Sequence, residues 1–222
     1  MSLRKLHQEI ISCSRCPRLR EHCREVARIK RKAYQEETYW GQPLPGFGDP
    51  RAKLLVVGLA PAAHGANRTG RVFTGDRSGD WLFRALHKSG FANQAESVSR
   101  DDGLALTGAF VTCVGRCAPP DNKPLPDELE ACSSFLVREL KLLKEVKVIL
   151  ALGQIALQGI WRHLEKSRSR PKFGHGASVA LSDGRHLLMS YHPSQQNTFT
   201  GRLTEPMLDS VFREARTRCK AL

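Results

Sequence analysis

A short run of apolar residues at 54–57 passes directly into a long loop, at 58–79, that is rich in glycine, small side chains and polar groups. A continuous apolar run that ends abruptly in such a loop is typical of a buried parallel strand, which delivers the loop at its carboxyl end. Ligands of open α/β sheets bind at that edge. The segment therefore predicts a parallel sheet with a ligand site in this loop.

Strand-like and helix-like patterns alternate along the rest of the chain, after a connecting loop at 34–50. We expect helices at 78–89, 127–146, 155–164 and 205–219, strands at 104–114, 148–152 and 186–190, and a turn that pairs 177–180 with the last of these strands. This alternation predicts a three-layer α/β/α fold with a central four-stranded, largely parallel sheet. Because no shift in composition divides the 222 residues, we predict a single domain over residues 1–222.

The chain is strongly basic, with 35 Lys and Arg against 22 Asp and Glu and a net charge of +13. Such an excess favours a polyanionic partner, above all nucleic acid, although a merely solvated surface would carry the same charge. The first 33 residues form a basic, helical region, for which a solvated helix face is the alternative. No apolar run approaches the ~18 residues of a membrane span, and the start of the chain lacks a secretory signal. We therefore expect a cytoplasmic protein with no membrane partner.

The chain has seven cysteines, an odd number that argues for metal binding or reactive thiols rather than a disulfide framework. Cys13 and Cys16 form a C-x-x-C pair before a proline, and Cys117 and Cys132 form a second, wider pair. Structural zinc usually recruits two tight pairs, so this irregular spacing suits an iron–sulfur cluster better. Buried thiols without a ligand are the alternative. Cys23 could replace one of the four, and the other two cysteines are expected to fill apolar positions.

Four motifs, read together with the cysteines, resemble the uracil-DNA glycosylase superfamily, and most closely its family five (type B), the iron–sulfur enzymes of bacteria and archaea. The motifs are GLAPAAHG at 58–65, RTGRVFTGD at 68–76, RCAPP at 116–120 and HPS at 192–194. They occur in the family's order and span nearly the whole chain. Each motif alone is a weak signal, whereas the set with the cysteines is specific.

The resemblance implies a four-stranded parallel sheet flanked by helices, in agreement with the pattern above. It implies an enzyme that flips and excises uracil from DNA, and in the type B group also deaminated purines such as hypoxanthine and xanthine. Without an amine nucleophile in the motifs, we expect hydrolysis that leaves an abasic site, by a monomeric, monofunctional glycosylase. The resemblance assigns one structural 4Fe–4S cluster to Cys13, Cys16, Cys117 and Cys132. The alternative is a non-catalytic iron–sulfur protein that binds nucleic acid.

Base excision requires a flipped nucleotide, an oxocarbenium-like sugar and a departing base that carries negative charge. Hydrogen-bond donors are therefore needed where charge develops on the base. His192, at the end of a strand and beside a rigid proline, is the expected donor, helped by backbone N–H groups around Ala60 and Ala62. Phe73 resembles the aromatic residue on which the flipped base stacks.

Two positions depart from the wider family. Many relatives carry Asp or Asn directly after the first strand to position the attacking water, and here that position is Ala60. The type B group shares this loss, and Asp76 in the same loop system is the expected replacement, with helix capping as the alternative role. Uracil-specific iron–sulfur relatives carry Asn where this chain has Cys113. A thiol forms only weak hydrogen bonds with the edge of a base, so this position predicts broad base specificity.

The remaining candidates are polar residues of the same loops. Asn122 is a further candidate for catalysis and Asn197 for substrate binding, with a structural role in a turn as the alternative for both. His64 could touch the base or a phosphate, and the segment that begins at Ser194 is expected to track the minor groove. The predicted substrate-binding residues are Gly58, Ala60, Ala62, His64, Phe73, Cys113, Ser194 and Asn197, and the predicted catalytic residues are Asp76, Asn122 and His192.

Overall fold

The computed structural model describes residues 2–165 and 167–220, and within them the chain folds around one six-stranded sheet. The strands are β1 Phe47–Gly48, β2 Leu54–Gly58, β3 Ala109–Cys113, β4 Val148–Leu152, β5 Ser178–Ala180 and β6 His186–Ser190, in the order β1-β3-β2-β4-β6-β5. The inner four are parallel, and β1 and β5 pair antiparallel at the two edges. The predicted α/β class and parallel core are therefore confirmed. Strand β5 lies in the segment expected to pair with 186–190, and β1 was not predicted.

The helices follow the predicted alternation with small shifts at their ends. They are α1 Leu3–Ile11, α2 Pro17–Ile29, α3 Ala66–Thr69, α4 Arg77–Lys88, α5 Pro126–Leu142, α6 Gln154–Leu164, α7 Gln195–Phe199 and α8 Glu205–Lys220, with 3-10 turns η1 Lys32–Tyr34 and η2 Pro120–Asn122. In the described part of the chain, no helix is long and apolar enough to cross a membrane.

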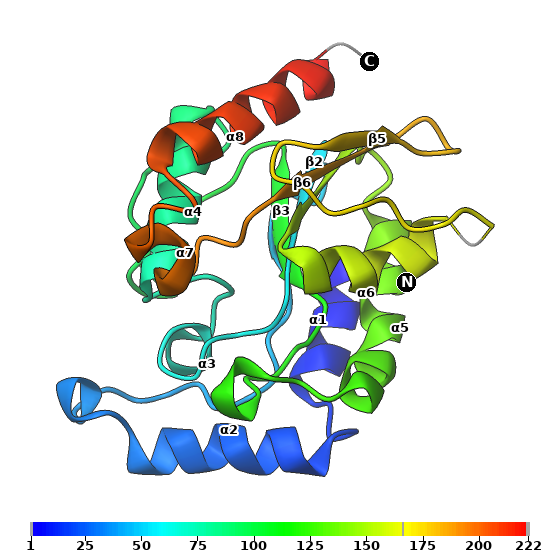
Figure 1. Cartoon of the computed structure of the whole chain (residues 1–222). Coiled ribbons are helices and arrows are strands. Elements are labelled where there is room, and N and C mark those ends of the chain that lie inside the picture. Colours follow the sequence, from blue (N-terminus) through cyan, green and yellow to red (C-terminus); the bar gives the residue numbers. More distant parts are fainter. Residues whose placement is uncertain (1, 166, 221–222) are drawn as a thin grey trace.

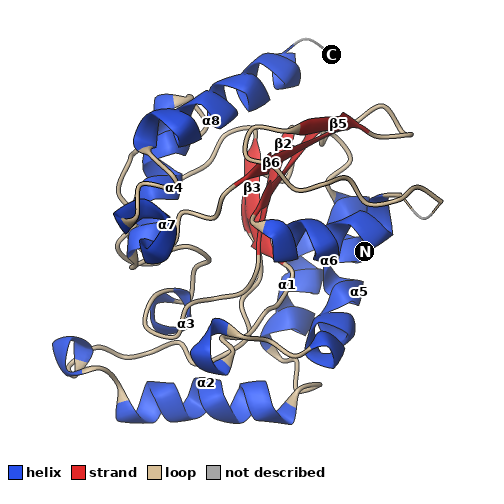
Figure 2. Cartoon of the chain, in the orientation of Figure 1, coloured by secondary structure: helices blue, strands red, loops and turns tan. Residues whose placement is uncertain are grey.

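Alternate residues of each inner strand face opposite layers of helices, as the period of a strand requires. Val56 and Leu150 pack into one buried cluster with residues of α4 and α8, whereas Leu55 and Ile149 pack into a second cluster with residues of α5 and α6. Figures 1 and 2 show the two helix layers on either side of the sheet. The predicted three-layer architecture is thus confirmed, and its continuous apolar strands are explained by burial on both faces.

The N-terminal region is helical with an interruption at 12–16, as the sequence predicts. Leu6 and Ile10 of α1 pack against Phe135 of α5 in a small cluster of their own. The following helix, α2, lies below the sheet in Figure 1, where it contacts α3. Helix α2 therefore covers the lower end of the molecule in this view, whereas α1 packs beside α5.

The carboxyl ends of the parallel strands meet at one edge, where Gly58 of β2 is in register with Cys113 of β3. The loops after β2, β3, β4 and β6 all leave the sheet there (Figure 1). These loops contain the four motifs that resemble the glycosylase family. The sheet therefore brings motifs from distant parts of the chain to one place.

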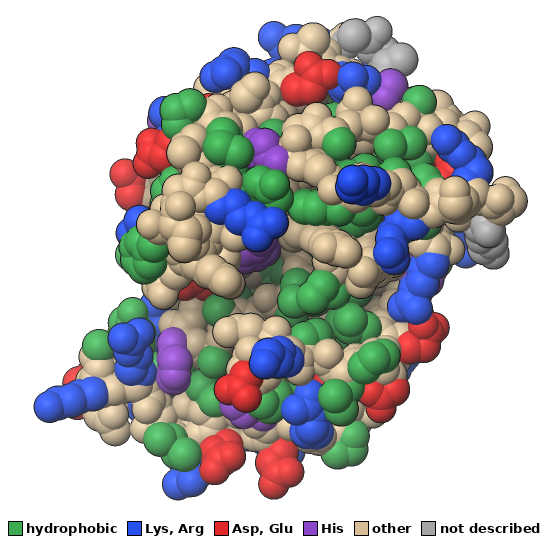
Figure 3. Space-filling view, in the orientation of Figure 1, with side chains coloured by type: hydrophobic (Ala, Val, Ile, Leu, Met, Phe, Trp, Pro, Cys, Tyr) green, Lys and Arg blue, Asp and Glu red, His purple; other side chains and the backbone are tan. Residues whose placement is uncertain are grey.

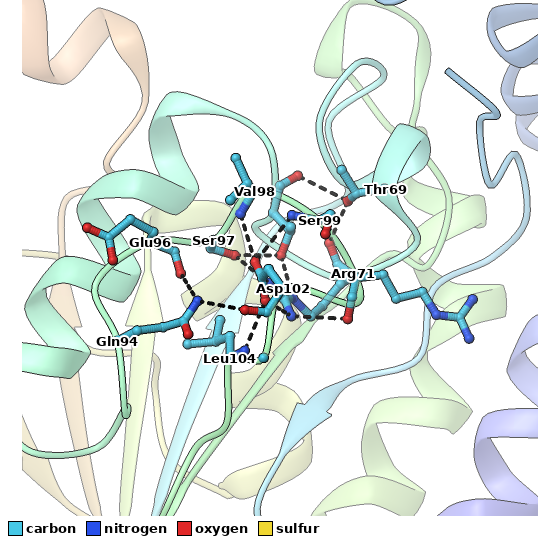
Figure 4. A network of polar contacts seen from close by, with 12 residues as sticks. Thr69, Arg71, Gln94, Glu96, Ser97, Val98, Ser99, Asp102 and Leu104 are labelled. Carbon is cyan, nitrogen blue, oxygen red and sulfur yellow. Dashed lines mark hydrogen bonds and ion pairs between the residues drawn. The ribbon is translucent and has the colours of Figure 1, made fainter. Parts of the chain in front are cut away.

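One of these loops is anchored by a polar network around Arg71 and Asp102, which Figure 4 shows from close by. The Arg71 guanidinium donates to both carboxylate oxygens of Asp102, at 2.9 and 2.7 Å, and to Ser97 Oγ at 3.1 Å. Although burial opposes it, the hydrogen bonds from Arg71 and from the backbone of Leu104 hold the pKa of Asp102 well below its usual range. The network keeps the 68–76 motif in place against the segment at 94–104.

Candidate active site

A cavity of about 540 Å³ opens at the carboxyl edge of the parallel strands. In the view of Figure 3 the surface is hollowed near its middle, below the ends of the strands. The residues that line the cavity are Leu59, Ala60, Pro61, Ala62, Phe73, Asp76, Arg77, Ser78, Cys113, Asp121, Asn122, His192, Ser194, Gln195 and Gln196. Its volume lies in the range of small-molecule sites, and its lining comes from the loops after β2, β3 and β6.

Most of the predicted site residues therefore meet in one cavity. Asp76, Asn122 and His192, the predicted catalytic residues, all line it. Five of the predicted substrate-binding residues line it as well, namely Ala60, Ala62, Phe73, Cys113 and Ser194.

Asp76 stands immediately before α4 and caps that helix. Its Oδ1 accepts a hydrogen bond from the backbone N–H of Gly79 at 3.1 Å. Burial raises the pKa of Asp76, while the hydrogen bonds from the backbone of Gly79 and Ser78 oppose that shift. Since the same carboxylate lines the cavity, helix capping and a role at the site are compatible for this residue.

His192 enters the cavity from the end of β6 and stacks against Phe73. The two rings lie 5.7 Å apart between centroids and 29° apart in plane. Burial lowers the pKa of His192 to about 4, so the imidazole is neutral at physiological pH. Its Nδ1 has no hydrogen-bond partner among residues 2–165 and 167–220. A neutral imidazole can still donate one hydrogen bond from a ring nitrogen to a ligand.

Phe73 occupies its place because Gly58 leaves room for the ring. A Cβ at Gly58 would lie 2.5 Å from Phe73 Cζ and 3.3 Å from Cys113 Sγ. Phe73 also adopts a left-handed backbone, with φ of +54°, which is unusual for an aromatic residue and marks a constrained position. Burial raises the pKa of Cys113 to about 12, so its thiol is neutral at the cavity wall.

Three predicted substrate-binding residues do not line the cavity. Gly58 lies beneath Phe73, and its role is to make room for that ring. His64 turns away to Tyr39, with 3.0 Å between its Nδ1 and the tyrosine hydroxyl. Asn197 binds the backbone of His192, because its Nδ2 donates to the His192 carbonyl at 2.8 Å. The loops carry these side chains, but long-range contacts decide where each one points.

Some residues that line the cavity were not predicted from the sequence. The most notable is Arg77, which follows Asp76 directly and whose Nε lies 3.4 Å from Thr198 Oγ1 of α7. Its position next to a predicted catalytic residue was the available signal. Asp121 is a second, since it precedes Asn122 in the same left-handed turn, with φ of 53° and 57° at the two residues.

All seven cysteines are free thiols, and four of them, Cys13, Cys16, Cys117 and Cys132, form a group apart from the cavity, near α1, α2 and the start of α5. Burial, followed by the electrostatic influence of Cys132 and Cys117, raises the pKa of Cys16 to about 11, with a smaller effect from Cys13. These four thiols therefore lie close enough to interact. Within the described residues, no three His, Cys, Asp or Glu side chains are arranged to hold a single metal ion. Cys23 packs against Cys117 and donates to the Ala118 carbonyl at 3.6 Å.

Comparison with known proteins agrees with the predicted family and fold class. The family model of the uracil DNA glycosylase superfamily matches residues 45–216. The chain belongs to the uracil-DNA glycosylase superfamily, as its motifs indicate. Its type-5 branch is the one that the more similar relatives share. The chain is 51% identical over 209 residues to the type-5 uracil-DNA glycosylase of Thermus thermophilus, and the match covers 94% of each chain.

Other relatives point to the same branch. The type-5 uracil-DNA glycosylase of Mycobacterium bovis is 50% identical over 217 residues, which cover 97% of this chain and 81% of the relative. Pyrobaculum aerophilum has one relative of each kind: its type-5 enzyme is 43% identical over 206 residues and its type-4 enzyme 30% identical over 202. The predicted family and its enzyme class, DNA glycosylase, are confirmed.

Proposed function

We propose that this protein excises uracil, and also hypoxanthine and xanthine, from DNA by hydrolysis and leaves an abasic site. The observation that carries the proposal is that the carboxylate of Asp76 and the neutral imidazole of His192 line one cavity. The names of the type-5 relatives support uracil in DNA as a substrate. The net charge of +13 favours a polyanionic substrate in addition.

In the proposed reaction, Asp76 orients a water molecule whose oxygen attacks the sugar carbon that bears the base. The bond from that carbon to the base nitrogen breaks, and its electron pair leaves with the base. Asp76 or bulk water takes the proton of the attacking water. Asp76 is suited to this role because a buried carboxylate with a raised pKa is a better base than an exposed one. His192 donates a hydrogen bond to the base oxygen on which the negative charge develops.

The walls of the cavity support broad base specificity. Cys113 presents a neutral thiol, which is a weak donor and acceptor and cannot form the paired hydrogen bonds of an amide. The side chains of Ala60 and Ala62 add only methyl groups. A site that makes few specific hydrogen bonds to a base leaves few groups unpaired when the base changes, so it discriminates weakly.

We also propose that Cys13, Cys16, Cys117 and Cys132 hold a 4Fe–4S cluster. The set fits because its members are free thiols that interact with one another, and thiolates are the usual ligands of such clusters. The cluster would act as a cross-link that ties the turn between α1 and α2 to the loop after β3 and to α5. No step of base excision is assigned to it.

The proposed partner is DNA, and we propose a monomeric protein that acts in the cytoplasm. The second candidate function, an iron–sulfur protein that binds nucleic acid without excision, shares this partner. Duplexes that each contain one uracil, hypoxanthine or xanthine separate the two functions. After incubation, alkali cleaves abasic sites, so strand breaks at the lesion support the glycosylase. Binding of the duplexes without strand breaks on any of them contradicts the glycosylase and favours the second candidate.

A further inference from the structure

A buried arginine of α2, Arg20, carries an N–H group that the fold leaves without an acceptor. The residue is only 8% exposed. Its Nη2 donates to the carbonyl of Gly41 at 3.2 Å, whereas its Nη1 is buried and has no hydrogen-bond partner among residues 2–165 and 167–220. A buried donor without an acceptor is costly, and more so when the group is charged. Nη1 is therefore available to a group that the described polypeptide does not supply.

The neighbours of this guanidinium are cysteines. Cys23, three residues further along α2, packs against Cys117 in a small buried cluster. The hydrogen bond with Cys23 and burial raise the pKa of Cys117, whereas the charge and the hydrogen bonding of Arg20 oppose that shift. Arg20 also lines a second cavity, of about 470 Å³, together with Cys13. Its side chain therefore lies near two of the four proposed cluster ligands, Cys13 and Cys117.

Two other arginines near the cysteines are already neutralised by carboxylates. Arg116 donates to both carboxylate oxygens of Glu139, at 3.0 and 2.6 Å. Arg18 binds Glu128 in the same bidentate manner, with both distances 2.8 Å. In the part of the chain that the structure describes, no Asp or Glu forms an ion pair with Arg20. Its positive charge is therefore not offset by a carboxylate.

We propose that Arg20 donates a hydrogen bond from Nη1 to a sulfur atom of the iron–sulfur cluster and offsets part of the negative charge of that cluster. This inference rests on the proposed cluster at Cys13, Cys16, Cys117 and Cys132. Thiolate ligands bring negative charge into a buried place, where it is costly without a compensating cation. Net charge and hydrogen bonds to the sulfurs set the reduction potential of such clusters. Because the reduced cluster carries one more negative charge than the oxidised one, Arg20 favours the reduced form.

The test measures the reduction potential of the purified holoprotein by following its visible absorption in a redox titration. Arg20→Met removes the charge and the donor but keeps an apolar side chain of similar length. At a given potential the ratio of reduced to oxidised cluster should fall about tenfold, which is a shift of about 59 mV to lower potential for one electron. Arg20→Lys retains the charge and should stay much closer to the wild type.

Arg28→Met is the matched control, since it removes the same charge from the same helix. The side chain of Arg28 is 76% exposed, so water and salt screen its charge and the potential should not change. An Arg20→Met protein with the wild-type potential overturns the proposal, even if it melts at a lower temperature, because support of Gly41 alone would act on stability only. A shift in Arg28→Met as large as that in Arg20→Met overturns it as well.

Two further measurements separate this inference from the proposed function. If Arg20→Met retains no iron, Arg20→Lys decides: iron and a potential close to those of the wild type support the proposal, and loss of iron from this variant too overturns it. A wild type without iron rejects the cluster assignment and this inference together. Uracil excision by the wild type tests the glycosylase independently, and if no base is excised, the potentials still decide the role of Arg20.

Discussion

The carboxylate of Asp76 lies directly against the Cα of Gly65. A Cβ at Gly65 would be 2.0 Å from Asp76 Oδ2 and 2.8 Å from its carboxyl carbon, well inside van der Waals contact. The other carboxylate oxygen, Oδ1, accepts from the backbone of Gly79. Two segments of one loop system thus hold the carboxylate between them, and the absence of a side chain at Gly65 sets its position.

Replacing Gly65 by alanine should therefore displace Asp76. We expect Gly65→Ala to slow single-turnover excision by about tenfold or more, because misplacing a catalytic group by about 1 Å can cost 10²-fold. Gly174→Ala is the matched control, since a Cβ there would meet only Ala177 Cβ at 3.6 Å. Duplex binding by Gly65→Ala should stay close to that of the wild type. Unchanged excision kinetics would contradict the positioning role of Gly65.

Asp76→Asn separates helix capping from catalysis. Asparagine caps helices as well as aspartate does, whereas alanine loses the cap at a cost of about 1 kcal/mol. Burial raises the pKa of Asp76, so its ionised form is penalised in the folded protein, and this penalty grows as the pH rises above the ordinary value. At pH 7 we expect Asp76→Asn to melt at the same temperature as the wild type or higher, and Asp76→Ala lower. Both variants should excise far more slowly while they bind DNA nearly as well.

The same carboxylate predicts a pH dependence of the wild-type rate. The rate should fall as the pH drops through the raised pKa of Asp76, at a pH above the ordinary value of about 3.9. Single-turnover rates measured across pH test this fall in rate, and the fall should be absent in Asp76→Asn. If it persists in that variant with the same midpoint, another group is responsible for it.

His192 should stay neutral across the working pH range. Burial lowers its pKa to about 4, so the neutral form is favoured in the folded protein, and the resulting stabilisation is lost as the pH falls from the ordinary value of about 6.5 towards 4. An NMR titration of the His192 imidazole should show no protonation near pH 6.5. His192→Ala should raise the activation free energy of excision by about 2.7–4 kcal/mol, the effect of removing an oxyanion donor. A protonated His192 at pH 7, or an unchanged rate in His192→Ala, would contradict its role as a neutral donor.

The cysteine assignment makes a prediction about colour and iron content. The wild type should be brown, and Cys132→Ala should yield a protein with much less iron and visible absorption. Cys23→Ala is the matched control, because Cys23 contacts Cys117 but is not one of the four proposed ligands. It should retain both iron and colour. A wild type that carries zinc and no iron, or a Cys23→Ala protein that loses its iron, would overturn the assignment.

The inner strands could be predicted from the sequence because strands buried on both faces have continuous apolar runs. Residues 148–152 and 186–190 form β4 and β6 as expected. Of the two edge strands, β5 lies in the segment that was expected to pair with 186–190. The other, β1, has only two residues, too few for a pattern, and lies in the predicted connecting loop. The strand expected at 104–114 spans only Ala109–Cys113, since Gly108 makes a turn with φ of +70° before it.

The sequence by itself determined the fold class, the family and the loops that build the cavity, because apolar runs and the order of motifs can be read along the chain. Only the tertiary structure decided the direction of each loop side chain. His64 faces Tyr39, Asn197 binds the backbone of His192, and Arg77 reaches across to Phe199. Each of these contacts joins residues that are 5 to more than 100 positions apart, and loop residues have no periodicity that would encode their partners. The side chains of a loop take their direction from the surfaces that folding brings next to them.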